Sequence, residues 1–340
     1  MERNEREMTI NDVAKIAGVS RGSVSNYLNN RKVSDKIRAK IEKAIAELNY
    51  VPSAAARDLR AQDSHFVIFI IPTIWSPLFS EFTYHVQDEL SKKNYKMILC
   101  ISNHDFEKEK EYLAMAESQK AAGVISVSYS QMNLHAKPGM PLISIEREPS
   151  GRFPMISSDN YQGGRLAAEK LQNSGCEHFI FIGEKEITSN AMGARQAGFI
   201  DYCMENHLDA HTYKVGKPKN RTEMDSELRE IFSQESLMRN AGIFAITDEY
   251  AQIAYDTLID MGISVPQHVQ IIGFDGSKST QNEMSRLSSI RQPIEEMARE
   301  SVEALEKYIA QAKNQELIAE VPRIYLPVSF QEGRTTRKAK

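Results

Sequence analysis

The sequence is poor in cysteine and has no long apolar run. Its three cysteines lie far apart and form no CxxC pair, so neither a disulfide framework nor a zinc site is expected. The longest apolar run, residues 66–71, is far shorter than the about 20 residues that a bilayer-spanning helix needs. The N-terminus is charged where a signal peptide needs an apolar core. These absences predict a cytoplasmic protein without a membrane segment.

The sequence also lacks the common motifs of nucleotide-dependent and nucleophilic enzymes. No GxGxxG follows the first expected strand, and GxxxxGK[ST] does not occur. No Ser-His-Asp or Cys-His pattern stands out, and His207 and His211 have no third metal ligand nearby. We therefore expect a protein that is not an enzyme and that uses no metal and no cofactor.

What is present is an ordinary globular composition with an uneven charge. Hydrophobic residues make up 41% and charged residues 26% of 340 residues, which is typical of folded chains with about two domains. Residues 1–60 hold twelve Lys/Arg and eight Asp/Glu, a net charge of +4, whereas the remainder carries −8. A basic head on an acidic body indicates that the head contacts a polyanion. The counts also leave open a chance fluctuation of surface charge.

Three short amphipathic helices are expected in this head. Apolar residues recur at helical spacing after Thr9, and Gly18 ends that helix because glycine adopts a left-handed turn without steric cost. Ser20 is placed to cap a second helix, and Ser34 to cap a third that reaches Leu48. Two short helices joined by a glycine turn and backed by a third predict a helix-turn-helix. The periodicity by itself also fits a plain helical bundle.

From residue 65 onward, apolar strands alternate with longer amphipathic helices. Strands are expected at 66–71, 96–101, 123–128, 141–145, 178–183, 242–247 and 269–274, and helices at 79–93, 107–122, 164–174 and 249–261. This alternation predicts parallel sheets that are covered on both faces. Because about 280 residues are many for one sheet, we expect two doubly wound lobes with a cleft at the carboxyl ends of their strands.

Motifs in both parts resemble one family. TINDVAKIAGVS (9–20), SVSNYLN (23–29) and AELNYVPS (46–53) resemble the start of the lactose-repressor (LacI/GalR) family of transcription regulators. In the body, the segments that resemble the family include PTIWSPLF (72–79), GARQAGF (193–199), IIGFD (271–275) and IRQP (290–293). The resemblance therefore extends from the head through the body.

The resemblance implies an all-α helix-turn-helix head and an α/β body of two doubly wound parallel-sheet lobes of the periplasmic-binding-protein type. It implies that the chain crosses between the lobes near Ser158, near Gln292 and near Val321. The expected boundaries are a head at 8–60 with a hinge helix at 53–60, a linker at 61–64 and a body at 65–333. The first lobe then comprises about 65–158 and 292–320, and the second about 159–291 and 321–330.

The resemblance also places the second helix in the major groove of DNA, with Arg21, Gly22 and Asn26 toward the bases. Arg21 suits guanine O6 and N7, and Asn26 suits adenine N6 and N7, although phosphate contacts are the alternative for both. Gly22 departs from the family pattern because it has no side chain; either Arg21 needs the space or readout is weak there. By the same match, Leu59 is the hinge-helix residue that wedges into a base step and kinks the duplex.

An effector site between the lobes is implied as well. Its expected members are Phe79, Glu146, Arg195, Thr247 and Asp275. Carboxylates, an arginine and an aromatic face suit a polyhydroxylated ligand, so we expect a sugar or a sugar phosphate. An ion pair or a helix cap is the structural alternative for each polar member.

Three features of this site depart from the family pattern. Glu146 stands where the family has Asp, which extends the carboxylate by one methylene. Trp75 replaces a smaller polar residue, and its indole either stacks on a sugar or packs between the lobes. The basic loop at 215–221 has no aromatic residue; its cations either bind a phosphate or form a solvated surface.

The function implied is a transcription repressor that binds a palindromic operator as a homodimer and responds to a small effector. No leucine heptads follow the last strand, so we expect a dimer and not a tetramer. Three alternatives are a regulator whose effector is a partner protein, as in the carbon-catabolite branch of the family, a solute-binding protein and a sugar-modifying enzyme.

The first prediction concerns the hinge. Leu59→Ala removes the wedge and leaves the major-groove residues unchanged, so operator affinity and DNA bending should both fall while the protein stays folded. Fluorescence anisotropy measures the affinity, and circular-permutation gel shifts measure the bend. Wild-type values for both would show that Leu59 is not the intercalating residue.

Overall fold

The computed structural model divides after His65 into a head and a body, which we describe separately. The described residues are 8–28, 31–50, 65–127, 135–137, 139–147, 153–185, 190–278, 286–314 and 321–338. The expected hinge helix at 53–60, and with it Leu59, lies outside them.

The head consists of three helices around a small apolar core. They are α1 (Ile10–Ala17), α2 (Arg21–Leu28) and α3 (Asp35–Leu48). Val13, Val24 and Ile41, one from each helix, are fully buried against one another. Gly18 has a φ of +61° after α1, and the Ser20 hydroxyl accepts a hydrogen bond from the Ser23 N–H at the start of α2. The predicted helix-turn-helix head is confirmed.

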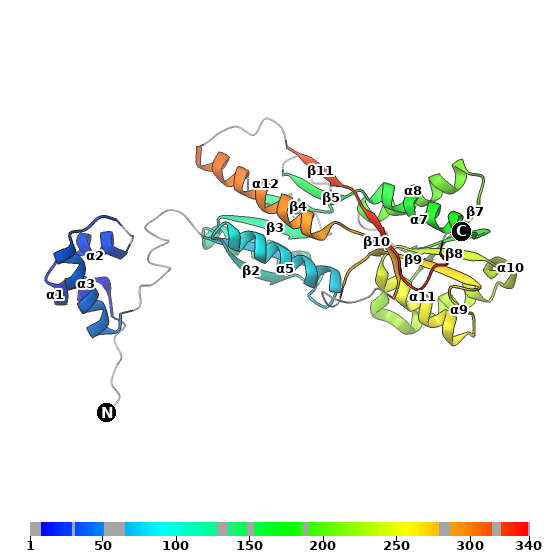
Figure 1. Ribbon diagram of the computed structural model, residues 1–340, viewed down its shortest axis with the longest axis horizontal. Coiled ribbons are helices and arrows are strands. Elements are labelled where there is room, and N and C mark those ends of the chain that lie inside the picture. Colours follow the sequence, from blue (N-terminus) through cyan, green and yellow to red (C-terminus); the bar gives the residue numbers. More distant parts are fainter. Residues whose placement is uncertain are drawn as a thin grey trace, which may run out of the picture. The chain divides into compact units, whose positions relative to one another are not determined.

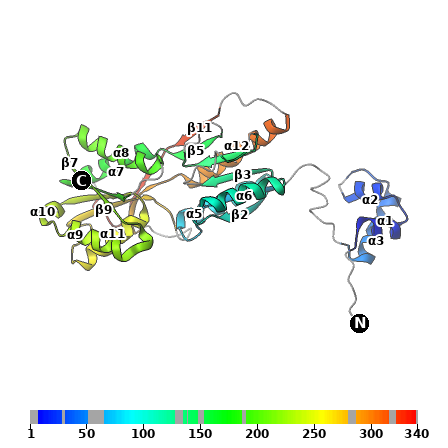
Figure 2. The same ribbon diagram turned by 180° about the vertical axis from the view of Figure 1, so that it is seen from behind.

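The first lobe of the body is a parallel sheet with helices on both faces. Its strands, in spatial order, are β11 (Arg323–Leu326), β5 (Met155–Ser158), β4 (Leu142–Ile145), β3 (Gly123–Val127), β1 (Phe66–Ile71) and β2 (Lys96–Ile101). One face carries α5 (Pro77–Lys92) and α12 (Ile294–Asn314), which lie side by side in Figure 1. The other face carries α6 (Phe106–Ser118), which is nearer the viewer in Figure 2.

Strand β1 shows why its sequence is apolar throughout. Val67 and Phe69 pack into the cluster with α5 and α12, whereas Ile68 and Ile70 pack into the cluster with α6. Alternate residues of a strand point to opposite faces, so a strand covered on both faces needs apolar residues at every position.

The second lobe repeats this arrangement around its own sheet. Its strands, in spatial order, are β12 (Ser329–Gln331), β10 (Ser288–Arg291), β9 (Val269–Asp275), β8 (Ala241–Ala245), β6 (His178–Glu184) and β7 (Asp209–Val215). All neighbours are parallel except β12, which is antiparallel to β10. The helices are α7 (Asn160–Asn173), α8 (Asn190–Glu205), α9 (Arg221–Phe232), α10 (Glu235–Met238) and α11 (Asp248–Asp260), with a 3₁₀ turn at Pro218–Asn220. The predicted fold class of two parallel-sheet lobes is confirmed.

The chain passes between the lobes at three places. The first two passages are β5 to α7, at 158–160, and β10 to α12, at 291–294. The third was expected near Val321, and that position is wrong. Strand β11 pairs in parallel with β5 and so belongs to the first lobe, which puts the passage between Leu326 and Ser329. Pro327, which has no N–H for a strand ladder, lies in this passage.

None of the helices in the described part of the chain combines the length and the apolar composition that a bilayer crossing requires.

Helices α7 and α8 pack with their backbones almost in contact. A Cβ atom built on Gly164 would lie 2.0 Å from the Arg195 carbonyl oxygen, and one on Gly198 would lie 1.9 Å from the Tyr161 carbonyl oxygen. Only glycine permits this approach at both positions. The contact fixes α8, and therefore Arg195, against the start of α7.

The second prediction tests this contact. Gly198→Ala forces two backbones apart and should lower the free energy of unfolding by about 3 kcal/mol, the upper range for an overpacked core. Gly216→Ala is the control, because a Cβ there would meet its nearest neighbour at an ordinary 3.6 Å. Chemical denaturation measures both variants. Equal stability of the two would contradict the close approach of α7 and α8.

Candidate functional site

The expected DNA-reading residues lie on one exposed side of α2. Arg21, Gly22 and Asn26 are exposed, whereas Val24 on the other side is buried in the head. A Cβ on Gly22 would contact only the Ser20 hydroxyl, at 3.6 Å. The head itself therefore has room for a side chain at Gly22, so any need for glycine there arises from Arg21 or from DNA.

Arg195 is the centre of the expected effector site. Its side chain is only 4% exposed, and its Nε donates to the Asn160 Oδ1 at 2.8 Å. Nη1 donates to the Ile246 carbonyl at 2.9 Å, and the guanidinium carbon lies 3.7 Å from the centre of the Phe274 ring. The Phe274 ring is 0% exposed, so it packs on the guanidinium and is not available to a ligand as the aromatic face expected from Phe79.

Two carboxylates face this guanidinium from opposite lobes. Nη1 of Arg195 lies 3.6 Å from the Asp275 Oδ1, and Nη2 lies 3.9 Å from the Glu146 Oε2. Asp275 ends β9 in the second lobe, and Glu146 follows β4 in the first. The structure therefore brings together three of the six expected residues, one arginine and two carboxylates.

Glu146 is held by groups at the first passage between the lobes. Its Oε1 accepts hydrogen bonds from the Ser158 N–H at 2.7 Å and the Ser157 hydroxyl at 3.2 Å. Its Oε2 accepts one from the Asn160 Nδ2 at 2.9 Å. The extra methylene of Glu thus carries the carboxylate to the start of α7, where both oxygens are bound by the protein.

Thr247 and Asp248 begin α11 beside this group. Thr247 is the N-cap residue of α11, and its carbonyl accepts a hydrogen bond from the Ala251 N–H. Its observed contact is therefore that of a helix start, which was the alternative to ligand binding. The Asp248 Oδ1 accepts the Ser289 hydroxyl at 2.6 Å. Burial raises the pKa of Asp248 well above the ordinary Asp value, and the neighbouring charge of Asp275 raises it further.

The two expected aromatic residues lie elsewhere. Phe79 is 8% exposed and belongs to the apolar cluster between the first sheet, α5 and α12. Trp75 is 93% exposed in the loop after β1, so its indole does not pack between the lobes. A contact of either ring with a ligand stays a prediction.

Two cations of the basic loop have carboxylate partners. The Lys217 Nζ lies 2.8 Å from the Glu184 Oε1, and the Arg221 Nη2 lies 2.6 Å from the Asp256 Oδ2. These pairs offset the charge of two of the loop's three cations, and the third, Lys219, is exposed to solvent. The solvated alternative therefore describes the loop better.

Sequence reasoning missed three polar residues of this group: Asn160, Ser158 and Gln292. Ser158 ends β5, a strand of only four residues whose two serines are not apolar, and Asn160 begins α7 two residues later. Gln292 lies in the IRQP segment, which was interpreted only as a passage between the lobes. A polar residue that is buried at such a passage was the available signal.

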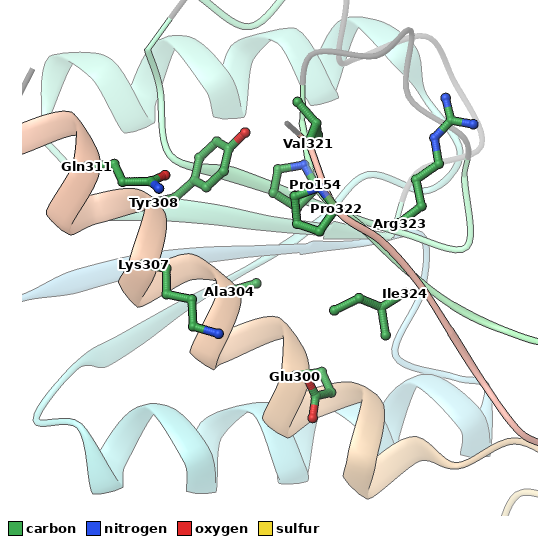
Figure 3. A pocket seen from close by; sticks show the side chains of 10 residues that line it. All are labelled: Pro154, Glu300, Ala304, Lys307, Tyr308, Gln311, Val321, Pro322, Arg323 and Ile324. Atoms are coloured by element: carbon green, nitrogen blue, oxygen red, sulfur yellow. The ribbon is translucent and has the colours of Figure 1, made fainter. Parts of the chain in front are cut away.

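A separate cavity of about 550 Å³ lies between α12 and β11 in the first lobe (Figure 3). Pro154, Ala304, Pro322 and Ile324 give it apolar walls, and Lys307 lines it with its ammonium group. None of the expected effector residues lines it. Within the described ranges, no group of three His, Cys, Asp or Glu side chains is arranged to hold a metal ion.

Family models match both parts of the chain. Residues 9–53 match the model described as bacterial regulatory proteins, lacI family, and residues 168–336 match a periplasmic binding protein-like domain. The sucrose operon repressor of Streptococcus mutans is 33% identical over 88% of this chain and 92% of its own length. The ribose operon repressor of Bacillus subtilis is 30% identical over 97% and 99%.

Solved structures agree with these matches. The lac repressor dimer bound to operator and the anti-inducer ONPF superposes with a TM-score of 0.83, at 20% identity over 98% of this chain and all of that one. A periplasmic binding protein/LacI transcriptional regulator from Alkaliphilus metalliredigens, complexed with D-xylulofuranose, gives 0.69 at 30% identity, over 81% of this chain and all of that one.

The third prediction follows from the raised pKa of Asp248. The folded protein holds this proton at pH values where the unfolded chain, with an Asp pKa of about 3.9, has lost it. Stability from this group is therefore lost as the pH rises from that value through the raised pKa. Between pH 5 and pH 8, the Tm of Asp248→Asn should fall by about 2–4 °C less than the Tm of the wild type. This difference corresponds to about 1 kcal/mol of stability.

Differential scanning fluorimetry across this pH range makes the measurement. Asp260→Asn, at the exposed end of the same helix, is the control and should follow the wild type. The same pH slope in all three proteins would contradict a raised pKa of Asp248.

Proposed function

The chain belongs to the lacI family of bacterial regulatory proteins, and we propose that it is an operator-binding repressor controlled by a carbohydrate bound at Glu146, Arg195 and Asp275. It works in the cytoplasm. It is a homodimer, because a two-fold dimer reads the two half-sites of a palindromic operator. Arg21, Gly22 and Asn26 face the bases, and Leu59 enters the minor groove. It is a binding protein and not an enzyme.

One observation carries the effector proposal: a buried arginine between two carboxylates, stacked on Phe274. A sugar offers hydroxyl groups that both donate and accept hydrogen bonds, together with an apolar ring face. Carboxylates accept hydrogen bonds from sugar hydroxyls, and a guanidinium donates hydrogen bonds to them. The group therefore matches a sugar better than an apolar or a cationic ligand.

The surrounding charges favour a neutral sugar over a phosphorylated one. Lys217 and Arg221 are paired with carboxylates, and two acidic residues stand in the site itself. A phosphate would gain little from the former and would be repelled by the latter. Relatives named for sucrose and ribose, and a structure with D-xylulofuranose, support the same class.

Control requires that the sugar binds two arrangements of the lobes with different affinity. The operator is then bound strongly in one arrangement and weakly in the other. An inducer and a corepressor both act in this way; they differ only in which arrangement of the lobes they bind more tightly.

Operator selection from random DNA, repeated with sucrose, D-ribose, D-xylulose, cellobiose and their phosphates, tests the proposal. One neutral sugar should change operator affinity. A response only to a phosphate would refute the neutral-sugar assignment. A response only to cell extract, carried by a protein fraction, would favour a partner protein as effector.

The fourth prediction assigns the site. Arg195→Lys keeps the charge but loses the planar fork and the stacking on Phe274. Sugar affinity should fall at least tenfold, about 1.4 kcal/mol. Arg221→Lys, an exposed arginine in the same lobe, is the control. Equal affinity in both variants would place the sugar elsewhere.

Emission from Trp75, the single tryptophan, is a convenient readout for this titration. The indole is 93% exposed, so a ligand or a lobe that covers it on binding would change its emission. Trp75→Phe should abolish the signal. Calorimetry gives the affinity independently of it.

A further inference from the structure

The residues around the proposed effector site close a ring of hydrogen bonds and ion pairs. The Glu146 Oε1 accepts the Ser158 N–H, and the hydroxyl of Ser158 donates to the Gln292 Oε1 at 2.7 Å. The Gln292 Nε2 donates to the Asp275 Oδ1, also at 2.7 Å. The contacts of the arginine described above complete the circuit. The members of this ring are Glu146, Ser158, Gln292, Asp275, Arg195 and Asn160.

The ring is almost entirely closed to solvent. Ser158 is 0% and Gln292 1% exposed, and Asn160 and Arg195 are each 4% exposed. A polar group buried to this degree has no water to replace a lost partner. Each member therefore depends on the next one for its hydrogen bonds, and a change at one contact is passed to its neighbours.

The ring also joins two passages between the lobes. Ser158 is the last residue of β5, where the chain leaves the first lobe, and Gln292 lies between β10 and α12, where it returns. The hydroxyl of Ser158 and the side chain of Gln292 link these passages directly. The Gln292 N–H also donates to the Asp275 carbonyl, which holds the second passage to the end of β9.

A sugar at this site must compete with the ring. Its hydroxyls have to bond with Arg195, Glu146 or Asp275, and both Glu146 oxygens, the Asp275 Oδ1 and the Arg195 Nε already have ring partners. A new partner on Asp275 weakens its bond to Gln292, and a new partner on Glu146 weakens its bond to Ser158. Both changes end at residues whose backbone dihedrals determine how the lobes are oriented.

We propose that Ser158 and Gln292 are positioning residues that couple occupancy of the effector site to the angle between the lobes, and through it to operator affinity. This inference rests on the proposed function. Neither residue needs to touch the sugar. The ion pair of Glu81 in α5 with Arg291 in β10 also joins the lobes, and the Arg291 Nη1 donates to the Gly276 carbonyl next to Asp275. It reaches the backbone beside the site, whereas Ser158 and Gln292 contact the side chains of Glu146 and Asp275 or their direct partners.

Two variants break the ring without altering its charged members. Ser158→Ala removes the hydroxyl but keeps the N–H that holds Glu146, and Gln292→Met replaces the amide with an apolar chain of similar size. Ser301→Ala is the matched control. This serine is also 0% exposed, and its hydroxyl donates to the Met297 carbonyl within α12, outside the ring.

The first measurement needs neither sugar nor DNA. Spin labels at Glu107→Cys in α6 and Met204→Cys in α8, both exposed, report the distance between the lobes. The three native cysteines are buried, and excess unlabelled chain keeps labels off the second subunit. Ser158→Ala and Gln292→Met should broaden the distance distribution, while Ser301→Ala should retain the wild-type one. Four identical distributions would overturn the proposal.

The second measurement is the ratio of operator affinities with and without a sugar. The sugar is the one of sucrose, D-ribose and cellobiose to which the wild type responds. In the two ring variants this ratio should fall at least fivefold although calorimetry still detects the sugar; Ser301→Ala should keep it. Wild-type ratios in the ring variants would overturn the coupling. A wild type that responds to none of the three refutes these sugars as effectors, and the distance measurement then decides on the ring.

Discussion

A guanidinium removed from water must be surrounded by acceptors, and the body of this protein is arranged around that requirement at Arg195. Burying an unpaired charge costs several kcal/mol, on the order of the whole stability of a domain. Two neutral acceptors, the Asn160 amide and the Ile246 carbonyl, bond directly to the side chain, while the two carboxylates stand farther away at 3.6 and 3.9 Å. The charge is thereby compensated without direct contact to either carboxylate, which is the condition a competing ligand needs.

The two carboxylates share an unusual backbone. Glu146 has a φ of +61° and Asp275 a φ of +117°, a region that side-chain-bearing residues rarely adopt. Such residues cost about 1–3 kcal/mol each and persist where their surroundings determine them strongly. Here the surroundings are the bonds from Ser158 to Glu146 and from Gln292 to Asp275. The two residues that link the passages, Ser158 and Gln292, therefore also hold the strained carboxylates in place.

The sequence predicts those helices and strands that can be recognised from the spacing of their own apolar and capping residues. Strand β1 is apolar at every position because both faces of its sheet are covered, and the head helices carry recognisable caps. The edge strands escape this reasoning: β7 reads DAHTYKV, and β11 reads RIYL before Pro327. Their assignment depends on pairing partners far away in the chain, which is why the third passage was misplaced. The partners of Glu146 were unpredictable for the same reason, since Ser158 and Asn160 meet it only after β4 and β5 have paired.

The glycine contact between α7 and α8 bears on how such a site diversifies over time. A helix pair that admits no Cβ cannot shift to move Arg195, because its backbone already touches the Arg195 carbonyl. This wall of the site is rigid, whereas substitutions at strand ends and loops of the opposite lobe alter the site without moving the arginine. Replacement of the family's Asp by Glu146 is a change of that kind. The two lobes therefore contribute unequally: the second lobe fixes the position of the guanidinium, and the first lobe sets how far the Glu146 carboxylate reaches toward it.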